Sequence, residues 1–173
     1  MKKSIRESKT GLLFGKHIVG WRERIALPDL GIAEMKAKID TGARTSALHA
    51  LDLKTEEHDG EQWVSFRVPH LGEHRSARHR ARIHDKRLIK NTSGVPQLRY
   101  VIKTEVVIGN RRWQIELSLT DRQEMKHDLI LGRTALRRHK LLVAPDRSYL
   151  AGNPLSVLLV APKKSTLRRV RAS

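Results

Sequence analysis

The sequence predicts a mainly β fold, a closed β-barrel with one short helix. Segments of alternating apolar and polar residues recur along the chain, and turn signals separate them about every ten residues, as in small β-barrels. Only residues 134–139 have the composition of a helix. Hydrophobic residues make up 39% of the 173, which suits the core of one globular domain.

The first half of the chain contributes strands separated by two turns. Alternation predicts the strands, and Pro, Gly and Asp mark the turns at residues 28–31 and 56–60. The strands predicted in this half are 18–26, 32–39, a short strand or turn at 47–51, and 62–68.

The second half begins with a basic, His-rich stretch, residues 70–87, that fits no element. A loop tip follows at 91–96, and the turn Gly109-Asn110 joins two strands into a hairpin. The elements predicted after the loop tip are strands 99–108 and 113–119, the helix 134–139, short strands 141–144 and 148–150, and an apolar β run at 156–160.

We expect one domain over residues 17–152, preceded by a basic N-terminal tail at 1–16 and followed by an apolar strand and basic tail at 153–173. The sequence contains no Cys, which fits a reducing compartment. The apolar run at 11–15 is shorter than the core of a secretory signal, and no run approaches the roughly 20 residues that cross a membrane. These features predict a cytoplasmic protein without a membrane partner.

The most informative motif is Asp40-Thr41-Gly42-Ala43, at the end of the strand predicted for residues 32–39. Aspartic proteases carry this turn, and their chemistry needs two carboxylates that share one proton. The motif occurs once in the chain, so one complete site requires a symmetric homodimer. A second motif, the apolar run 129–131 followed by Gly132-Arg133, matches the strand that packs beside this turn in retroviral proteases.

In these two motifs the chain resembles the retropepsin superfamily, and within it a bacterial family of retropepsin-like aspartic proteases, the RimB-like family. The resemblance covers about residues 17–152 and implies the acid-protease fold and a dimeric aspartic peptidase. Because RimB is encoded beside the glutamate ligase RimK, it also implies a glutamate-rich substrate, such as a poly-glutamate tail on a ribosomal protein, with the ligase or the ribosome as a further partner. The segments that carry the narrower resemblance are 18–23, 36–50, 111–113 and 146–150.

Asp40 is the candidate catalytic residue. One ionised Asp40 would deprotonate a water, while Asp40 of the second copy would protonate the carbonyl oxygen of the scissile bond. The resemblance implies that Thr41 makes hydrogen bonds across the dimer and that Gly42 presents its backbone to the substrate. The alternative is that Asp40 is an ordinary aspartate of a surface turn.

A basic substrate cleft is predicted around this turn. Ala43 and Arg44 complete it, and Arg44 stands where retroviral enzymes usually have an aspartate. Arg44 and Arg133 would repel each other unless an anion lay between them, and guanidinium groups bind carboxylates in bidentate fashion. The cleft would therefore select acidic peptides. The alternative is that Arg44 points to solvent or pairs with an acidic neighbour.

Lys90, Ser93, Gly94 and Arg99 lie where retropepsins carry the flap, the hairpin that closes over the substrate. A flap needs a flexible tip, which Gly94 supplies. The two cations would again hold an acidic peptide. The alternative is an ordinary exposed hairpin with solvated charges.

No cofactor is expected. His70, His74, His79 and His84 cluster, but their spacing fits no common zinc site, and the His-Glu-x-x-His motif is absent. The stretch is also rich in Arg, which repels a cation. The Gly-x-x-x-x-Gly-Lys-Ser/Thr loop that cradles nucleotide phosphates is absent as well, so we expect neither metal nor ATP.

The chain carries 35 Lys and Arg against 18 Asp and Glu, a net charge of +17. This charge predicts attraction to polyanions, whether acidic polypeptides, nucleic acid or ribosomes. It supports a rival hypothesis, a non-catalytic RNA- or ribosome-binding module on a retropepsin scaffold that uses residues 74–87 and the basic C-terminal tail. Against it, no helix-turn-helix, RNA-binding strand motif or zinc finger is visible. Asp40→Asn separates the hypotheses, because it should abolish peptidase activity and leave polyanion binding intact.

Overall fold

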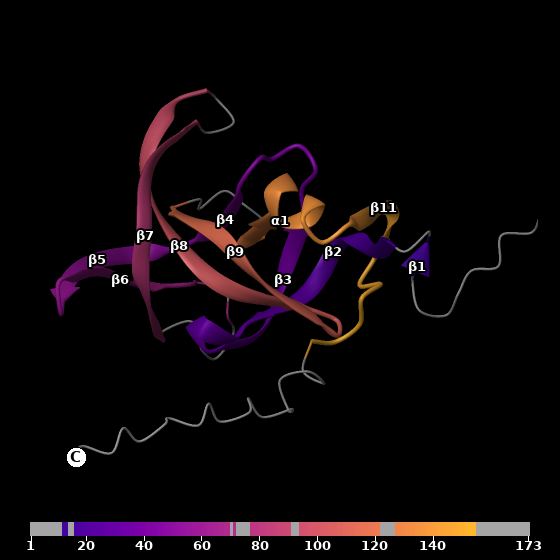
Figure 1. Ribbon diagram of the computed structural model, residues 1–173, viewed down its shortest axis with the longest axis horizontal. Coiled ribbons are helices and arrows are strands. Elements are labelled where there is room, and N and C mark those ends of the chain that lie inside the picture. The colour runs from indigo at the N-terminus through magenta and orange to yellow at the C-terminus, as the bar shows by residue number, and fades with distance from the viewer. Residues whose placement is uncertain are drawn as a thin grey trace, which may run out of the picture.

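The computed structural model describes residues 12–13, 16–69, 71, 77–90, 94–121 and 127–154. Within them the chain is mainly β with one short helix, as predicted (Figure 1). That helix has five residues, and no helix in the described ranges is long and apolar enough to cross a membrane. The elements are β1 (Leu12–Leu13), β2 (Lys16–Leu27), η1 (Pro28–Leu30), β3 (Ile32–Ile39), β4 (Ser46–His49), β5 (Leu51–His58), β6 (Glu61–Arg67), β7 (Arg78–Lys90), β8 (Pro96–Ile108), β9 (Arg111–Thr120), β10 (Leu129–Leu131), α1 (Arg133–Arg137) and β11 (Leu141–Ser148).

The strands form one mixed sheet in the order β1-β2-β3-β10-β4-β9-β8-β7-β6-β5, with β11 paired to β2. Strand β2 also pairs with β8, through Ile25 with Ile108 and Ala26 with Val107. This extra pairing joins β2, β3, β10, β4, β9 and β8 into a ring-like arrangement. The pairs β3–β10 and β4–β9 are parallel, so strands from distant parts of the sequence meet beside the Asp40 turn.

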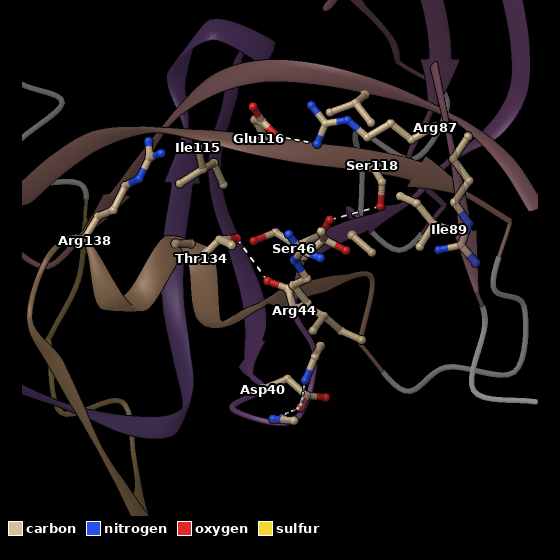
Figure 2. Close-up of a pocket in the computed structure, with 18 of the residues that line it drawn as sticks. Asp40, Arg44, Ser46, Arg87, Ile89, Ile115, Glu116, Ser118, Thr134 and Arg138 are labelled. Carbon is tan, nitrogen blue, oxygen red and sulfur yellow. Dashed lines mark hydrogen bonds and ion pairs between the residues drawn. The ribbon is translucent and has the colours of Figure 1, made fainter. Parts of the chain in front are cut away.

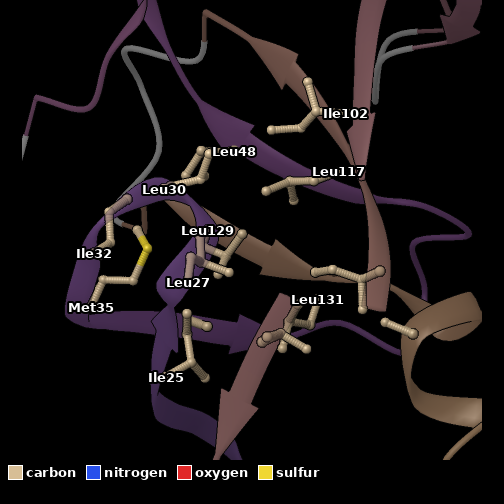
Figure 3. Packing of buried hydrophobic residues seen from close by; sticks show 14 of the residues in the cluster. Ile25, Leu27, Leu30, Ile32, Met35, Leu48, Ile102, Leu117, Leu129 and Leu131 are labelled. Atoms are coloured by element: carbon tan, nitrogen blue, oxygen red, sulfur yellow. The ribbon is translucent and has the colours of Figure 1, made fainter. Parts of the chain in front are cut away.

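The core lies inside this ring. Leucine and isoleucine side chains from six strands pack there and are almost completely removed from water, which stabilises the fold by about 1.5–3 kcal/mol for each side chain (Figure 3). The residues at its centre are Ile25, Leu27, Leu48, Ile102, Leu117, Leu129 and Leu131.

Strand β3 shows how this core positions the candidate site. Its inward residues Met35, Ala37 and Ile39 are buried, whereas Lys36 is exposed. Because side chains alternate along a strand, the residue after Ile39 faces away from the core. The alternation therefore delivers Asp40 to the outer face of the sheet.

Glu23 is a fully buried charged residue on β2. Its carboxylate accepts backbone hydrogen bonds from Gly20 at 2.5 Å, from Leu150 at 3.0 Å and from Ala151 at 3.2 Å. Burial raises the pKa of Glu23, and the three backbone donors oppose that rise. Glu23 thus ties the segment after β11 to β2.

Several predicted elements need correction. The stretch 70–87, which fitted no element, contains the start of the 13-residue strand β7. The predicted turn at 56–60 is shorter, because β5 continues to His58. Residues 148–150 are not a separate strand, since β11 ends at Ser148. The apolar run at 156–160 lies outside the described residues.

Candidate active site

The Asp40 carboxylate is held by its own turn. Its backbone N–H donates to the carbonyl oxygen of Leu131 at 2.9 Å, which continues the pairing of β3 with β10. Its Oδ1 accepts from the backbone N–H of Gly42 at 3.0 Å and of Ala43 at 3.1 Å. Its Oδ2 lies 3.2 Å from the ammonium of Lys38. The carboxylate is fixed in direction, yet 23% of the side chain stays exposed.

These contacts decide the charge of Asp40. Burial alone would raise its pKa, but the hydrogen bond from Ala43, the ammonium of Lys38 and the hydrogen bond from Gly42 together lower it below the usual value. In a single chain Asp40 is therefore ionised at neutral pH. A carboxylate in that form can act as a general base.

The start of α1 supports the turn through hydrogen bonds to the carbonyl groups that follow Asp40. The backbone N–H of Arg133 donates to the carbonyl of Ala43 at 2.8 Å, and both the N–H and the hydroxyl of Thr134 donate to the carbonyl of Arg44, at 3.2 and 3.0 Å. Amides at a helix start have no partner within the helix, so they are available for such bonds. The contact is close because Gly132 has no side chain: a Cβ there would lie 2.5 Å from the carbonyl oxygen of Thr45.

A groove of about 1080 Å³ opens beside the turn (Figure 2). Its walls come from the turn, β9, the β7–β8 hairpin and α1. Figure 2 shows Arg138 and Ile115 on one side of the turn, and Arg87 and Ile89 on the other. The groove thus runs between the Asp40 turn and the hairpin predicted to be a flap.

The groove brings together six of the predicted site residues, and three lie outside its lining. Thr41, Gly94 and Arg133 do not line it, and Ser93 lies outside the described residues. Arg133 instead directs its guanidinium to the carbonyl of Thr41, at 3.4 Å. The predicted residues that line the groove are Asp40, Gly42, Ala43, Arg44, Lys90 and Arg99.

Three further basic residues, none of them predicted as a site residue from the sequence, also line the groove: Arg87, Arg138 and His139. Arg87 faces Arg99 across the hairpin and donates to Glu116 at 2.6 Å, and it also bonds Asp85. Recognising β7 as a strand would have revealed Arg87, because antiparallel pairing places it opposite Arg99. Arg138 and His139 directly follow α1, a position that no motif marked.

The predicted flap is an antiparallel hairpin of β7 and β8, paired from Ile83 with Ile102 out to Lys90 with Pro96. Gly94 at its tip has a φ of 79°, a conformation that glycine adopts readily. Leu88 and Leu98 form a cross-strand pair, and they are 73% and 67% exposed. The hairpin therefore carries an apolar patch above the groove.

The family model of the retropepsin-like aspartic endopeptidase RimB matches residues 18–154. The chain belongs to this RimB-like family. The resemblance seen in the sequence is thereby confirmed, and the Asp40 turn lies within the matched segment.

Curated relatives of this RimB-like chain carry the name "Probable alpha-L-glutamate ligase". It is 38% identical over 139 residues to the one from Shewanella pealeana and 40% identical over 140 residues to the one from Parasynechococcus marenigrum. These matches cover 79% and 80% of this chain. The chain spans only 30% of the length of either relative, so their name describes much longer proteins.

A solved structure shares the fold of the RimB-like chain. It is a Legionella pneumophila protein of unknown function from the DUF785 group, with a TM-score of 0.64 and 25% identity. The match covers 78% of this chain and 97% of that one. The fold described here is therefore not peculiar to this sequence.

The histidines of the RimB-like chain do not gather around a common point in the described residues. His79 is buried, and its Nδ1 lies 2.8 Å from the carbonyl oxygen of Leu30. His84 lies 3.6 Å from Glu116. His70 and His74 are outside the described residues. Among the residues that are described, no group of three or more His, Cys, Asp or Glu side chains is placed to hold a metal.

The arginines of the stretch 74–87 are engaged with acceptors where the structure describes them. Arg80 bonds Glu56 at 2.6 Å and Arg82 lies 2.9 Å from Glu61. Arg78 donates to the hydroxyl of Ser65 at 3.0 Å. The carboxylates of Glu56 and Glu61 reduce the positive field that the rival RNA-binding hypothesis assigned to this stretch, whereas Arg78, on a neutral acceptor, keeps its charge.

Proposed function

We propose that two copies of this chain form one aspartic peptidase site that cleaves glutamate-rich peptides. The observation that carries the proposal is the Asp40 turn, which occurs once in the chain and lies partly exposed at the edge of a groove lined with cations. A two-fold axis next to Asp40 would bring the two carboxylates together. Thr41 and Gly42 are exposed at the tip of the turn and are available for contacts across that axis.

In this dimer the two Asp40 carboxylates share one proton, because two like charges about 3 Å apart cannot both ionise. The ionised Asp40 takes a proton from the attacking water. Its protonated partner gives a proton to the carbonyl oxygen of the scissile bond. The bonds from Gly42 and Ala43 hold Oδ1, so each carboxylate keeps its direction during the transfer.

The charge of the groove supports an acidic substrate. Arg44, Lys90, Arg99 and Arg138 line it, whereas the carboxylate of Glu116 is already bound to Arg87 at 2.6 Å. Guanidinium groups bind carboxylates with charge-assisted hydrogen bonds that are stronger than neutral ones. A chain of glutamates would meet a cation at successive positions along this groove.

The relatives named as glutamate ligases suggest where such a substrate arises. Part of each relative resembles this peptidase chain, and the remainder has the length for a second activity. We propose that the substrate is a poly-glutamate tail on a ribosomal protein, and that the peptidase associates with a glutamate ligase or with the ribosome. The peptidase would then shorten or remove what the ligase adds.

The test is incubation of the protein with oligo-glutamate and with mixed-sequence peptides, followed by mass spectrometry of the products. Cleavage between glutamates that is lost in Asp40→Asn supports the proposal. Specific activity should also fall on dilution below the dimer dissociation constant. Activity that persists in Asp40→Asn, or that is the same at every dilution, would exclude a shared Asp40 site.

A further inference from the structure

A second basic surface lies beside Asp40, on the side away from the flap. Strand pairing places Arg22 opposite Lys38, and Lys38 opposite Ile130, which lines the groove. Paired residues on neighbouring strands project from the same face of a sheet. The row that forms the groove floor therefore continues across β10 to Lys38 on β3 and Arg22 on β2.

The charges on this outer face of β2 and β3 do not cancel. Arg24 is paired with Glu34 at 2.7 Å, and Lys38 with Asp40 at 3.2 Å. Arg22 is held by contacts that leave its charge in place: its guanidinium lies 4.2 Å from the centre of the Trp21 ring, and its Nε donates to the hydroxyl of Ser148 at 3.4 Å. Lys36 projects from β3 and is exposed.

His127 reports the same positive field. Its ring packs edge-on against Trp21, with the centroids 6.1 Å apart. Burial lowers the pKa of His127, and the nearby charges of Arg22, Lys38 and Lys36 lower it further, against the opposing effect of Asp128. Three cations from two strands thus lie near enough to one ring, that of His127, to act on its charge.

We propose that Arg22, Lys36 and Lys38 form an anion subsite that binds carboxylates of the acidic substrate on the far side of Asp40 from the flap. This proposal rests on the proposed function, which it deepens. Lys38 stands beside the catalytic carboxylate, and Lys36 stands two residues further back along β3, a distance of about 7 Å. Alternate side chains of an extended peptide have the same spacing, so two glutamates of one chain can meet the two lysines.

The aromatic rings on this face favour a peptide over a nucleic acid. Arg22 lies over the ring of Trp21, and both Arg22 and Arg24 lie within 5.6 Å of the centre of the Tyr149 ring. The rings therefore position guanidinium groups, whereas a nucleic-acid surface uses aromatic rings to stack bases. The fixed guanidiniums suit carboxylates, which they bind in a planar, directed way.

The first arm of the test measures binding without turnover. Fluorescence anisotropy of labelled deca-glutamate is recorded with Asp40→Asn protein, alone and with Arg22→Gln and Lys36→Gln added together. A matched control instead adds Lys54→Gln and Arg82→Gln, which also remove one lysine and one arginine charge, but from the exposed face of β5 and β7. We expect the subsite pair to raise Kd at least tenfold and the control pair to raise it less than twofold.

The second arm measures turnover. In protein that keeps Asp40, the substitutions Arg22→Gln and Lys36→Gln together should raise KM for hexa-glutamate. The rise in KM should be smaller with peptides too short to reach Lys36. An equal rise in Kd for both pairs, or none for either, overturns the subsite. The subsite would also be overturned if a ten-nucleotide RNA bound more tightly than deca-glutamate and if Arg22→Gln with Lys36→Gln abolished that RNA binding. The face would then be a nucleic-acid surface.

The two arms separate the subsite from the peptidase proposal. Cleavage that depends on Asp40, together with wild-type binding by the subsite pair, removes the subsite and leaves the peptidase. Selective loss of deca-glutamate binding without any cleavage leaves the subsite and removes the peptidase.

Discussion

Replacing Gly132 by alanine tests whether the contact between the start of α1 and the catalytic turn controls activity. The new Cβ would lie 2.5 Å from the carbonyl oxygen of Thr45, 2.6 Å from its carbonyl carbon and 3.0 Å from that of Arg44. All three are backbone atoms, which cannot rotate away as a side chain does. Because carbon contacts are most favourable at about 3.5–4.0 Å, the turn and α1 must separate by on the order of 1 Å.

The expected loss has two parts. Overpacking of this kind costs about 1–3 kcal/mol of stability, and each kcal/mol lowers Tm by about 2–4 °C for a chain of this size. The same displacement moves the Asp40 turn, because the carbonyls of Ala43 and Arg44 are bonded to the first amides of α1. A shift of about 1 Å in a catalytic geometry costs on the order of 100-fold in rate, so kcat/KM should fall by about that factor.

Gly60→Ala is the matched control. Gly60 has a φ of 73°, and no atom lies within 4 Å of where its Cβ would be, so alanine there costs only the strain of the left-handed conformation, about 1–2 kcal/mol. The site lies in the β5–β6 turn, away from the groove. Tm is measured by circular dichroism, and kcat/KM on an acidic peptide well below both Tm values. If Gly132→Ala keeps wild-type kcat/KM, or Gly60→Ala loses as much, the support from α1 does not govern catalysis.

Three other predictions concern the charge of Asp40, the charge of Arg44 and the independence of the activity from metal. In a single chain the pKa of Asp40 is lower in the folded than in the unfolded state, so its contribution to stability is present above the unfolded pKa and is lost as pH falls through the folded pKa. Urea midpoints measured on the monomer, at concentrations below the dimer dissociation constant, should therefore fall more steeply between neutral and strongly acidic pH for the wild type than for Asp40→Asn. Parallel curves would contradict this. Arg44→Glu should lower kcat/KM for glutamate peptides by roughly 5- to 150-fold, since a charge-assisted contact contributes about 1–3 kcal/mol; matched Gln peptides are the control, and an unchanged Glu preference would argue against the cleft. EDTA should leave peptidase activity unchanged, whereas inhibition that zinc reverses would point to a metalloenzyme.

The strand that carries Asp40 could be read from the sequence because its pattern is local. Met35, Ala37 and Ile39 alternate with polar residues, and the structure gives β3 the predicted bounds. Strand β7 escaped notice because its inward positions include His79, and histidine does not register as apolar in such a pattern. Arg87 was missed for the same reason. The predicted domain limits and the cytoplasmic location stay predictions.

The family resemblance predicted one contact between distant residues, the packing of residues 129–133 beside the Asp40 turn, but other such contacts were beyond prediction from the sequence. Nothing in the alternation of β2 shows that Glu23 finds backbone donors 127 and 128 residues later. The sequence paired Arg44 with Arg133 in one cleft, but only Arg44 lines the groove, because the guanidinium of Arg133 turns to the carbonyl of Thr41. Such outcomes depend on how the ring of strands closes, which no single segment encodes.

The bonds from Gly132, Arg133 and Thr134 to the segment around the Asp40 turn join residues 86 to 92 positions apart in the chain. During synthesis, therefore, the turn leaves the ribosome long before the segment that supports it. A nascent chain that ends before Leu129 carries Asp40 but lacks both β10 and α1, so it should be inactive as a peptidase. Peptidase activity should therefore appear only after α1 has been synthesised and has packed against the turn. A chain released before that point should not cleave other proteins.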